Sequence, residues 1–132
     1  MSQQPQHIMK NAAAWFEIPA ADLERAKSFY QSIFGMQMID MDLGETLKMS
    51  LFPVGEQGVG GALCEHADFY KPGYEGALVY FDANPNLQTI LDRVEPSGGK
   101  ILQQKTQIAE EYGYMAIFED SEGNRVALHS TN

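Results

Sequence analysis

The order of strand-like and helix-like segments occurs twice in this chain of 132 residues, and that internal repeat constrains the fold more than any other feature. Shifting the second half back by 63 to 65 residues places Gly98 or Gly99 on Gly35, and residues 127–129 on residues 62–64. Each copy predicts a strand, a helix and three strands, in a unit too short to bury a sheet face alone. We therefore expect an α+β fold, with two tandem βαβββ modules pairing into a curved sheet around a shared cleft.

The first module is predicted around a helix, because apolar residues recur at helical spacing from Leu23 to Phe34. Asp22 before them is a residue type that caps helix N-termini, and Gly35 follows where helices commonly end on glycine. Pro19 ends the strand expected before the helix. The four strands of this module are predicted over residues 12–18, 37–42, 46–54 and 59–65.

The second module follows a polar link over residues 66–76, which carries the aromatic residues Phe69, Tyr70 and Tyr74. These aromatic side chains either pack over the core or contact a ligand at the mouth of the cleft. A helix is predicted over residues 86–95 from its apolar stripe. The strands of this module are predicted over residues 77–81, 100–105, 113–119 and 125–130, with a turn over 120–124.

The domain boundaries follow from this arrangement and from the length of the chain. A flexible polar tail is expected over residues 1–7, followed by one domain over 8–132 that divides into modules over 8–66 and 76–130. The start of the chain lacks the basic and apolar segments of a signal peptide. No apolar run reaches the ~20 residues that span a bilayer, so we expect a cytoplasmic protein.

Acidic residues outnumber basic ones by two to one. Nine Lys and Arg against eighteen Asp and Glu give a net charge of −9. Nucleic acids and anionic lipid surfaces attract basic protein faces, so this charge argues against both kinds of partner. The single cysteine, Cys64, excludes an internal disulfide, and no zinc-type spacing of cysteines and histidines is present.

Two sequence phrases carry a resemblance to a known family. Residues 16–30 read FEIPAADLERAKSFY, and residues 118–128 read FEDSEGNRVAL. Together with the repeated order of elements, they make residues 8–130 resemble the vicinal oxygen chelate superfamily. Its members include glyoxalase I, bleomycin resistance proteins and extradiol dioxygenases. The resemblance implies the paired βαβββ fold but selects no activity, because the superfamily spans lyases, epimerases, dioxygenases, transferases and drug-sequestering proteins.

The resemblance also implies where a metal would bind. The family takes one ligand from the first strand and one from the last strand of each module, and these positions fall on Trp15, Ala62, Leu78 and Ala127. None of the four side chains offers the donor atoms that proteins normally use for a divalent cation. The chain therefore resembles a metal-free, glyoxalase-like branch, with no cofactor expected. Lactoylglutathione lyase activity, which needs a metal to polarise the substrate carbonyls, is expected to be absent.

Four polar or titratable residues stand two positions beyond the family's ligand positions, on the same strand faces: Glu17, Cys64, Tyr80 and His129. One interpretation leaves them at strand ends, solvated or paired with neighbours. A second makes them the polar anchors of a ligand pocket floored by Trp15, with Glu17 and His129 as acid/base or hydrogen-bonding groups. A third is a displaced metal site that uses Glu17 and His129, with Cys64 as a further ligand.

The leading functional hypothesis is that a small apolar or aromatic molecule binds in the cleft without the family metal. Metal-independent acid/base chemistry at the candidate catalytic residues Glu17 and His129 would extend it. The residues expected to contact the ligand are Trp15, Cys64, Leu78, Tyr80 and Ala127. One alternative is a metal-dependent lyase or dioxygenase that uses the displaced site. Another is a non-catalytic interaction or regulatory protein whose cleft is filled by its own side chains.

A two-fold symmetric homodimer is also expected. Each four-stranded sheet leaves an edge of unpaired backbone donors and acceptors, which favours pairing or cover. Seven Met, seven Phe and six Tyr make the apolar surface considerable for a chain of this length. The charge of −9 opposes association only weakly, because physiological salt screens it over about 8 Å.

Overall fold

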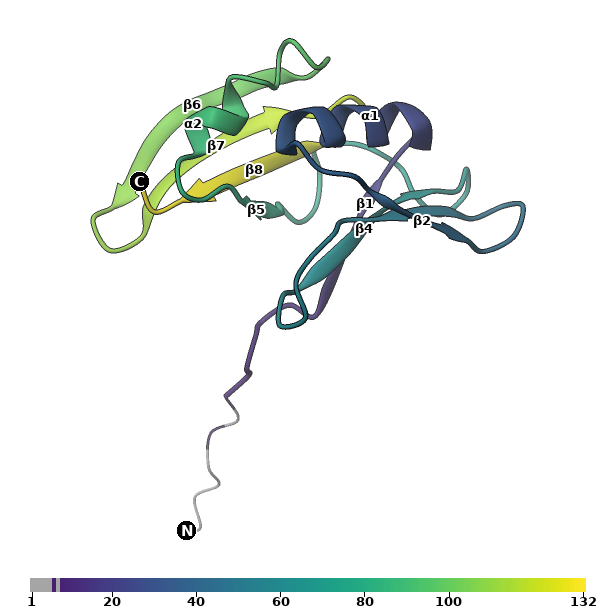
Figure 1. Cartoon of the computed structure of the whole chain (residues 1–132), viewed down its shortest axis with the longest axis horizontal. Helices are drawn as coiled ribbons and strands as arrows, with labels where there is room; N and C mark the ends of the chain where they lie inside the picture. The colour runs from purple at the N-terminus through teal and green to yellow at the C-terminus, as the bar shows by residue number, and fades with distance from the viewer. Residues whose placement is uncertain (1–5, 7) are drawn as a thin grey trace.

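The computed structural model of the chain describes residue 6 and residues 8–132. The flexible tail expected over 1–7 therefore lies outside the described residues, except for residue 6. The described residues form two four-stranded mixed sheets, in the orders β1-β4-β3-β2 and β5-β8-β7-β6 (Figure 1). In each sheet the first strand runs parallel to the last, and the other neighbours are antiparallel. The α+β class and the two tandem βαβββ modules are confirmed.

Each module has one helix packed against its own sheet. The elements of the first module are β1 (Trp15–Pro19), α1 (Leu23–Phe34), β2 (Ile39–Asp42), β3 (Lys48–Leu51) and β4 (Gly60–Glu65). Those of the second are β5 (Tyr80–Asp82), α2 (Leu87–Leu91), β6 (Lys100–Ala109), β7 (Gly113–Glu119) and β8 (Arg125–Ser130). Helix α1 contacts β3 and β4, whereas α2 contacts β6, β7 and β8.

The ends of α1 follow the sequence prediction. The carboxylate of Asp22 accepts a hydrogen bond from the backbone N–H of Arg25 at 3.1 Å, which satisfies one of the free donors at the helix start. Gly35 adopts a left-handed conformation with φ of 63°, and its N–H donates to the carbonyl of Gln31. A residue with a Cβ would be strained in that conformation, which explains the glycine.

Three elements of the second module differ from prediction in length. Strand β5 begins at Tyr80 rather than residue 77, and α2 ends at Leu91 before a series of turns. Strand β6 continues to Ala109, well beyond the predicted end at residue 105. Its pairing with β7 runs through several register irregularities. The extra strand residues of β6, which read TQIA, are thus held by pairing with β7. Their own sequence has no alternating pattern long enough to indicate a strand.

The two modules share one hydrophobic core. The ring of Phe81, from β5, lies 5.6 Å from that of Phe16 in β1 and 5.3 Å from that of Phe52, which follows β3. Tyr30 of α1 is completely buried against Phe52 and Phe81. Because these rings come from both halves of the chain, neither module closes its core alone, as the shortness of each repeat predicts.

The turn over residues 120–124 connects the second module to the start of α1. The carboxylate of Asp120 is buried and accepts hydrogen bonds from the Tyr30 hydroxyl at 2.7 Å and from the Asn124 backbone N–H at 2.9 Å. The Asn124 side chain also donates to the carbonyl of Pro19 at 2.7 Å. Burial raises the pKa of the Asp120 carboxyl, although these hydrogen bonds oppose the rise. We call the turn over residues 120–124, with its contacts to β1 and α1, the clamp.

Glu122 adds an ion pair to the clamp. Its carboxylate accepts from the Arg25 Nε at 2.7 Å and from the Asp22 backbone N–H at 2.7 Å. Burial acts to raise the pKa of Glu122, but the hydrogen bond and charge of Arg25, together with the bond from Asp22, hold it below its ordinary value. The sequence phrase at 118–128 therefore contains residues that join the two modules.

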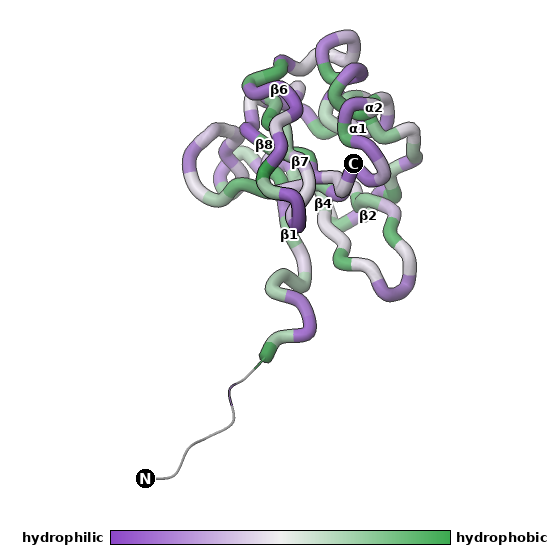
Figure 2. The backbone as a smooth tube through the Cα atoms, turned by 90° about the vertical axis from the view of Figure 1, so that its left-hand side faces the viewer, coloured by the Kyte–Doolittle hydropathy of each residue, from purple (hydrophilic) through white to green (hydrophobic). Residues whose placement is uncertain are grey.

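Hydrophobic and hydrophilic stretches of backbone alternate through the body of the fold (Figure 2). Residues 8–14 are exposed and lead away from that body towards the N-terminus. Among the described residues, no helix has the length and apolar character to cross a membrane.

Candidate ligand site

The strand register places the sequence-predicted site residues on the sheet faces away from the helices. In the first sheet, Glu17 lies opposite Ala62, and Trp15 lies opposite Gly60. In the second sheet Tyr80 lies opposite Ala127, and Asp82 lies opposite His129. The alternate residues of the same strands, such as Ile18, Leu63, Phe81 and Leu128, belong to the hydrophobic core. Alternation along a strand therefore places the candidate residues on the sheet face opposite the helices, where Cys64 and Ala127 are nevertheless buried.

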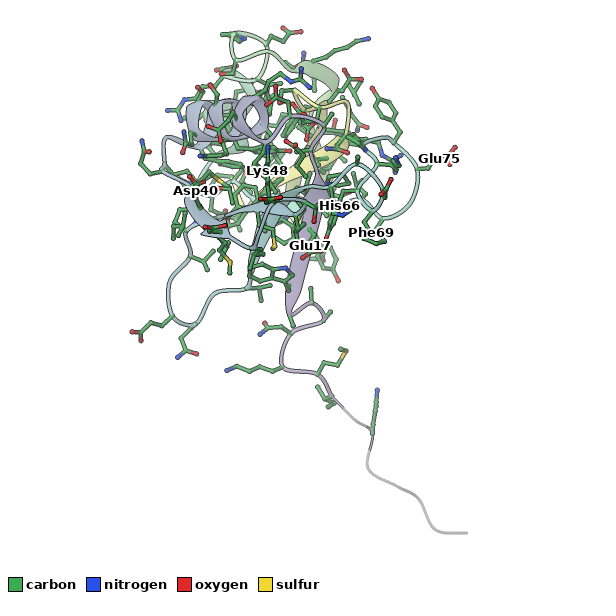
Figure 3. The ribbon with its side chains drawn as sticks, turned by 90° about the vertical axis from the view of Figure 1, so that its right-hand side faces the viewer. Glu17, Asp40, Lys48, His66, Phe69 and Glu75 are labelled. Atoms are coloured by element: carbon green, nitrogen blue, oxygen red, sulfur yellow. The ribbon has the colours of Figure 1, made fainter. Side chains whose placement is uncertain are left out.

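Glu17 is the centre of a small polar cluster. One carboxylate oxygen accepts from the Tyr70 hydroxyl at 2.6 Å, and the other from the Trp15 indole N–H at 3.3 Å. Tyr70 comes from the link between the modules, and its hydrogen bond to Glu17 raises the pKa of its hydroxyl above the usual range. Figure 3 shows Glu17 with His66 and Phe69, two other residues of this part of the molecule.

Cys64 is completely buried in the same sheet. Burial, reinforced by the negative charge of Glu17, raises the pKa of the Cys64 thiol to about 11. The thiol is therefore protonated at neutral pH and is a poor nucleophile.

The aromatic residues of the link make different contacts. Tyr74 donates from its hydroxyl to Glu119 on the second sheet, just as Tyr70 donates to Glu17 on the first. Phe69 is 78% exposed, and its ring lies against that of His66 at a tilted angle, with 4.5 Å between ring centroids. The link is thus fastened to both sheets by tyrosine–carboxylate hydrogen bonds, a role that its composition did not indicate.

His129 has a separate set of partners. Its Nε2 lies 2.5 Å from the carbonyl oxygen of Tyr112, in the turn between β6 and β7. Since a carbonyl only accepts, Nε2 carries the proton and, in the neutral ring, Nδ1 is the free acceptor. No hydrogen bond joins His129 to Glu17 in the part of the chain that the structure describes. That part also contains no group of three or more His, Cys, Asp or Glu arranged to hold a metal ion.

An apolar cavity of about 540 Å³ opens between the two modules. Four phenylalanine side chains form much of its wall, with 5.2 to 5.6 Å between the ring centroids of neighbouring pairs: Phe16, Phe34, Phe52 and Phe81. Val54, Val59 and Gly60 line it from the β3–β4 connection and the start of β4. Leu78, Tyr80 and Asp82 line it from the second module.

The cavity includes some of the residues predicted to contact a ligand and not others. Leu78 and Tyr80 line it, whereas Cys64 and Ala127 do not. Trp15 lies beside it, because its ring is 3.4 Å from the position that a Cβ on Gly60 would occupy. Sequence analysis missed the phenylalanine wall and Asp82. The alternation of apolar residues indicates burial, but the gap between two sheets depends on packing that no local pattern encodes.

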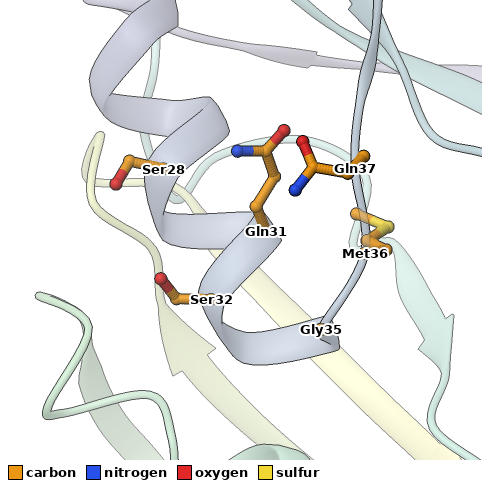
Figure 4. A pocket seen from close by; sticks show the side chains of 6 residues that line it. All are labelled: Ser28, Gln31, Ser32, Gly35, Met36 and Gln37. Carbon is orange, nitrogen blue, oxygen red and sulfur yellow. The ribbon is translucent and has the colours of Figure 1, made fainter.

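A second, shallower groove runs along the outer side of α1 (Figure 4). It has a volume of about 330 Å³ and is lined by Ser28, Gln31, Ser32, Gly35, Met36 and Gln37. The Gln31 side-chain oxygen already accepts from the Met38 backbone N–H at 2.9 Å. No titratable side chain lines this groove, so it offers no acid/base or ionic chemistry.

Solved structures with a similar fold include proteins of different kinds. A hypothetical protein from S. aureus, SA1046, matches with a TM-score of 0.67 and 20% identity over 95% of this chain and 96% of that one. TnmS3, an antibiotic binding protein from Streptomyces sp. CB03234, matches with a TM-score of 0.66 and 21% identity over 96% and 100%. A glyoxalase I mutant from Zea mays matches with a TM-score of 0.70 and 17% identity, over 90% of this chain but only 44% of its own.

At these identities the structural likenesses establish the fold and leave the activity open. No curated protein has a significantly similar sequence. The family assignment comes from a sequence model of the Glyoxalase/Bleomycin resistance protein/Dioxygenase superfamily, which matches residues 6–128. That range contains the first module, the clamp, the cavity residues and all but the last two strand residues of the second module. The chain belongs to this superfamily.

Proposed function

We propose that this protein binds a small apolar or aromatic molecule in the cavity between its two modules. The observation that carries the proposal is the cavity itself, whose volume of about 540 Å³ falls within the range of ~300 to 1,000 Å³ typical of ligand pockets. Its wall of phenylalanine rings suits a flat or hydrophobic guest. The likeness to an antibiotic binding protein supports binding of a small molecule as the general kind of function.

The proposed binding does not use the metal positions of the family. Trp15, Ala62, Leu78 and Ala127 occupy those positions and lack suitable donor atoms. We assign no catalytic step to Glu17 and His129, because each is hydrogen-bonded within its own group of residues. Their free lone pairs remain available as hydrogen-bond acceptors for a ligand that extends beyond the cavity.

Binding of a neutral aromatic compound tests the proposal. Isothermal calorimetry with naphthalene-1-methanol should give saturable binding of one molecule per chain, with a Kd below about 1 mM. Val59→Trp should weaken it at least about tenfold, because Val59 lines the cavity on an exposed connection where a larger side chain blocks entry. Ile108→Trp, at an exposed position outside the cavity, is the matched control and should leave the Kd unchanged. The absence of saturable binding, or equal affinities in both variants, would contradict the proposal.

We further propose a two-fold homodimer that covers the face of the first sheet away from α1. Ile39 and Met41 of β2 are 54% and 41% exposed on this face, and Trp15 of β1 is 44% exposed. Exposed apolar side chains gathered on one sheet face are typical of an interaction surface. Light scattering should give about twice the chain mass of 14.7 kDa, and Met41→Lys should reduce it towards one chain. A monomeric wild-type protein at micromolar concentration would refute the dimer.

A further inference from the structure

We infer that the link over residues 66–76 is a hinged cover, which opens away from the first sheet while it stays attached to the second. Opening gives small molecules access to Glu17 and Cys64, on the face of the first sheet away from α1. The inference goes beyond the proposed function, since it does not depend on a ligand in the cavity. The two ends of the link are attached unequally, and this asymmetry determines where it opens.

The attachment to the second sheet involves the backbone of the link. Gly73 donates from its N–H to the Asn124 side-chain oxygen at 3.1 Å, and its carbonyl accepts from the Arg125 backbone N–H at 3.3 Å. Tyr74 adds its hydrogen bond to Glu119. Two of these bonds cannot be released by rotation of a link side chain, because they involve the backbone of Gly73. This end of the link is therefore fixed, and Gly73 is the point about which the link turns.

The attachment to the first sheet depends on one side chain. Between residues 66 and 72, the bond from the Tyr70 hydroxyl to Glu17 at 2.6 Å is the only hydrogen bond to a sheet within the part of the chain that the structure describes. The others stay inside the link, such as those from the Phe69 and Tyr70 N–H groups to the His66 carbonyl. Residues 67–69 are exposed and belong to no helix or strand. Segments with few contacts open at a lower free-energy cost than the rest of a fold, so this end opens first.

The Tyr70 side chain covers Cys64 when the link is closed. Cys64 is completely buried, yet it lies outside the hydrophobic core, which Leu63 beside it enters on the opposite face of the strand. Its cover must therefore lie on the outer face of the sheet. Burial and the charge of Glu17 raise the pKa of the Cys64 thiol, and the nearby Tyr70 hydroxyl opposes that rise. The thiol therefore becomes accessible when Tyr70 leaves Glu17.

The rate at which 4,4′-dithiodipyridine modifies Cys64 at pH 7.5 measures this opening. Tyr70→Phe keeps the ring but loses the bond to Glu17. It should raise the rate about tenfold or more, the size expected for a hydrogen bond to a charged group. Loss of the hydroxyl alone would raise the pKa of Cys64 further and slow the reaction. A faster reaction therefore results from access to the thiol and not from its reactivity.

Two further Tyr→Phe variants are matched controls. Tyr74→Phe removes the bond to Glu119 but leaves both backbone bonds of Gly73, and it should change the rate by less than about twofold. Tyr112→Phe alters a tyrosine that is 66% exposed and lies outside the link, and it should have equally little effect. Repeating the series in the Met41→Lys background, which disrupts the proposed dimer interface, measures the effect of the link in either oligomeric state.

Urea separates opening of the link from unfolding of the whole chain. Opening the link exposes little surface, so about 1 M urea should change the rate for Tyr70→Phe by less than about twofold, whereas reaction through global unfolding would accelerate more than about fivefold. The inference fails if Tyr70→Phe reacts at the wild-type rate, if Tyr74→Phe accelerates the reaction as much, or if the urea dependence is that of global unfolding. Each of these results leaves the proposed binding in the cavity unaffected.

Discussion

The clamp and the cavity lie in the same small fold, yet they use polar groups in opposite ways. In the clamp, Asp120 and Asn124 are buried and hydrogen-bonded to several partners. Around the cavity such groups are scarce, because the lining residues other than Tyr80 and Asp82 have apolar side chains. Satisfied buried networks rigidify a fold, whereas apolar cavities of this size are typical of ligand pockets. The comparison supports the proposal that the clamp holds the modules together and that the cavity binds the ligand.

Removing Asp120 should produce the largest loss of stability. Asp120→Ala leaves the buried Tyr30 hydroxyl and the N–H groups of the turn without their acceptor. We expect urea denaturation to show a loss of about 3 kcal/mol in the free energy of unfolding. Asp42→Ala, at an exposed position, is the control and should change it by less than about 0.5 kcal/mol. A loss below about 1 kcal/mol for Asp120→Ala would mean that the clamp does not hold the modules.

Two glycines compare the packing next to the clamp, at Glu119, with the packing next to the cavity. A Cβ on Gly99 would lie 2.6 Å from the Glu119 backbone oxygen, which cannot move without distorting β7. A Cβ on Gly61 would lie 2.5 Å from the Phe16 ring, which borders the cavity and has space to shift. Gly99→Ala should therefore cost about 3 kcal/mol in unfolding free energy and Gly61→Ala about 1 kcal/mol.

The two variants should also differ in their effect on ligand binding. Gly61→Ala should lower the affinity for naphthalene-1-methanol, because the displaced Phe16 ring enters the cavity. Folded Gly99→Ala protein should bind the compound as the wild type does. Equal destabilisation by the two variants, with unchanged binding in both, would remove the distinction between rigid packing next to the clamp and adaptable packing next to the cavity.

The Arg25–Glu122 ion pair should contribute less than Asp120. Glu122→Gln should cost about 1 kcal/mol at pH 7, because Arg25 is more than half exposed and solvent screens the pair. The pKa of Glu122 is lowered in the folded protein, so its contribution is complete above the ordinary value of 4.5 and is lost as the pH falls through the folded value. The stability difference between wild type and variant should shrink on acidification in that window. A difference that grows instead would contradict the ion pair.

The pH dependence of stability that we expect from Asp120 has the opposite sign to that from Glu122. Its pKa is raised in the folded protein, so its ionisation opposes folding as the pH rises from the ordinary value of 3.8 through the folded value. The pH dependence of Asp120→Asn relative to wild type should therefore run opposite to that of Glu122→Gln.

The last prediction concerns the reactivity of Cys64, which is completely buried in the first sheet. A pKa of about 11 against the ordinary 9.0 leaves about a hundredfold less thiolate at neutral pH. Reaction of the folded protein with a disulfide reagent should accordingly be at least about a hundredfold slower than that of the urea-unfolded chain. Complete modification within minutes at pH 7.5 would show that the Glu17 cluster does not bury this thiol.

The sequence predicted the parts of the fold that local chemistry determines. Helix α1 begins after Asp22 and ends at Gly35 as expected, because a cap and a left-handed glycine leave local signatures. Strands β7 and β8 have the predicted bounds, 113–119 and 125–130. The end of β6 was missed, since residues 106–109 become strand by pairing with β7 rather than through an apolar pattern. The shortening of β5 likewise depends on where β8 is available to pair.

The candidate site was less accessible to sequence reasoning. The residues singled out by alternation, Glu17, Cys64, Tyr80 and His129, share a sheet face in their respective strands, but their hydrogen-bonded partners Tyr70 and Tyr112 come from connections. A connection's path is set by the modules that it joins, so these contacts have no spacing signature. The cavity, in turn, arises between two sheets whose separation depends on large core rings.

A crystal structure of the protein with naphthalene-1-methanol bound would test the central claim most directly. Our account predicts the naphthalene ring in the cavity between the modules, in contact with Phe16, Phe52 and Phe81. Electron density for the compound on the exposed face beside Trp15 and Glu17, with the cavity between the modules empty, would contradict it.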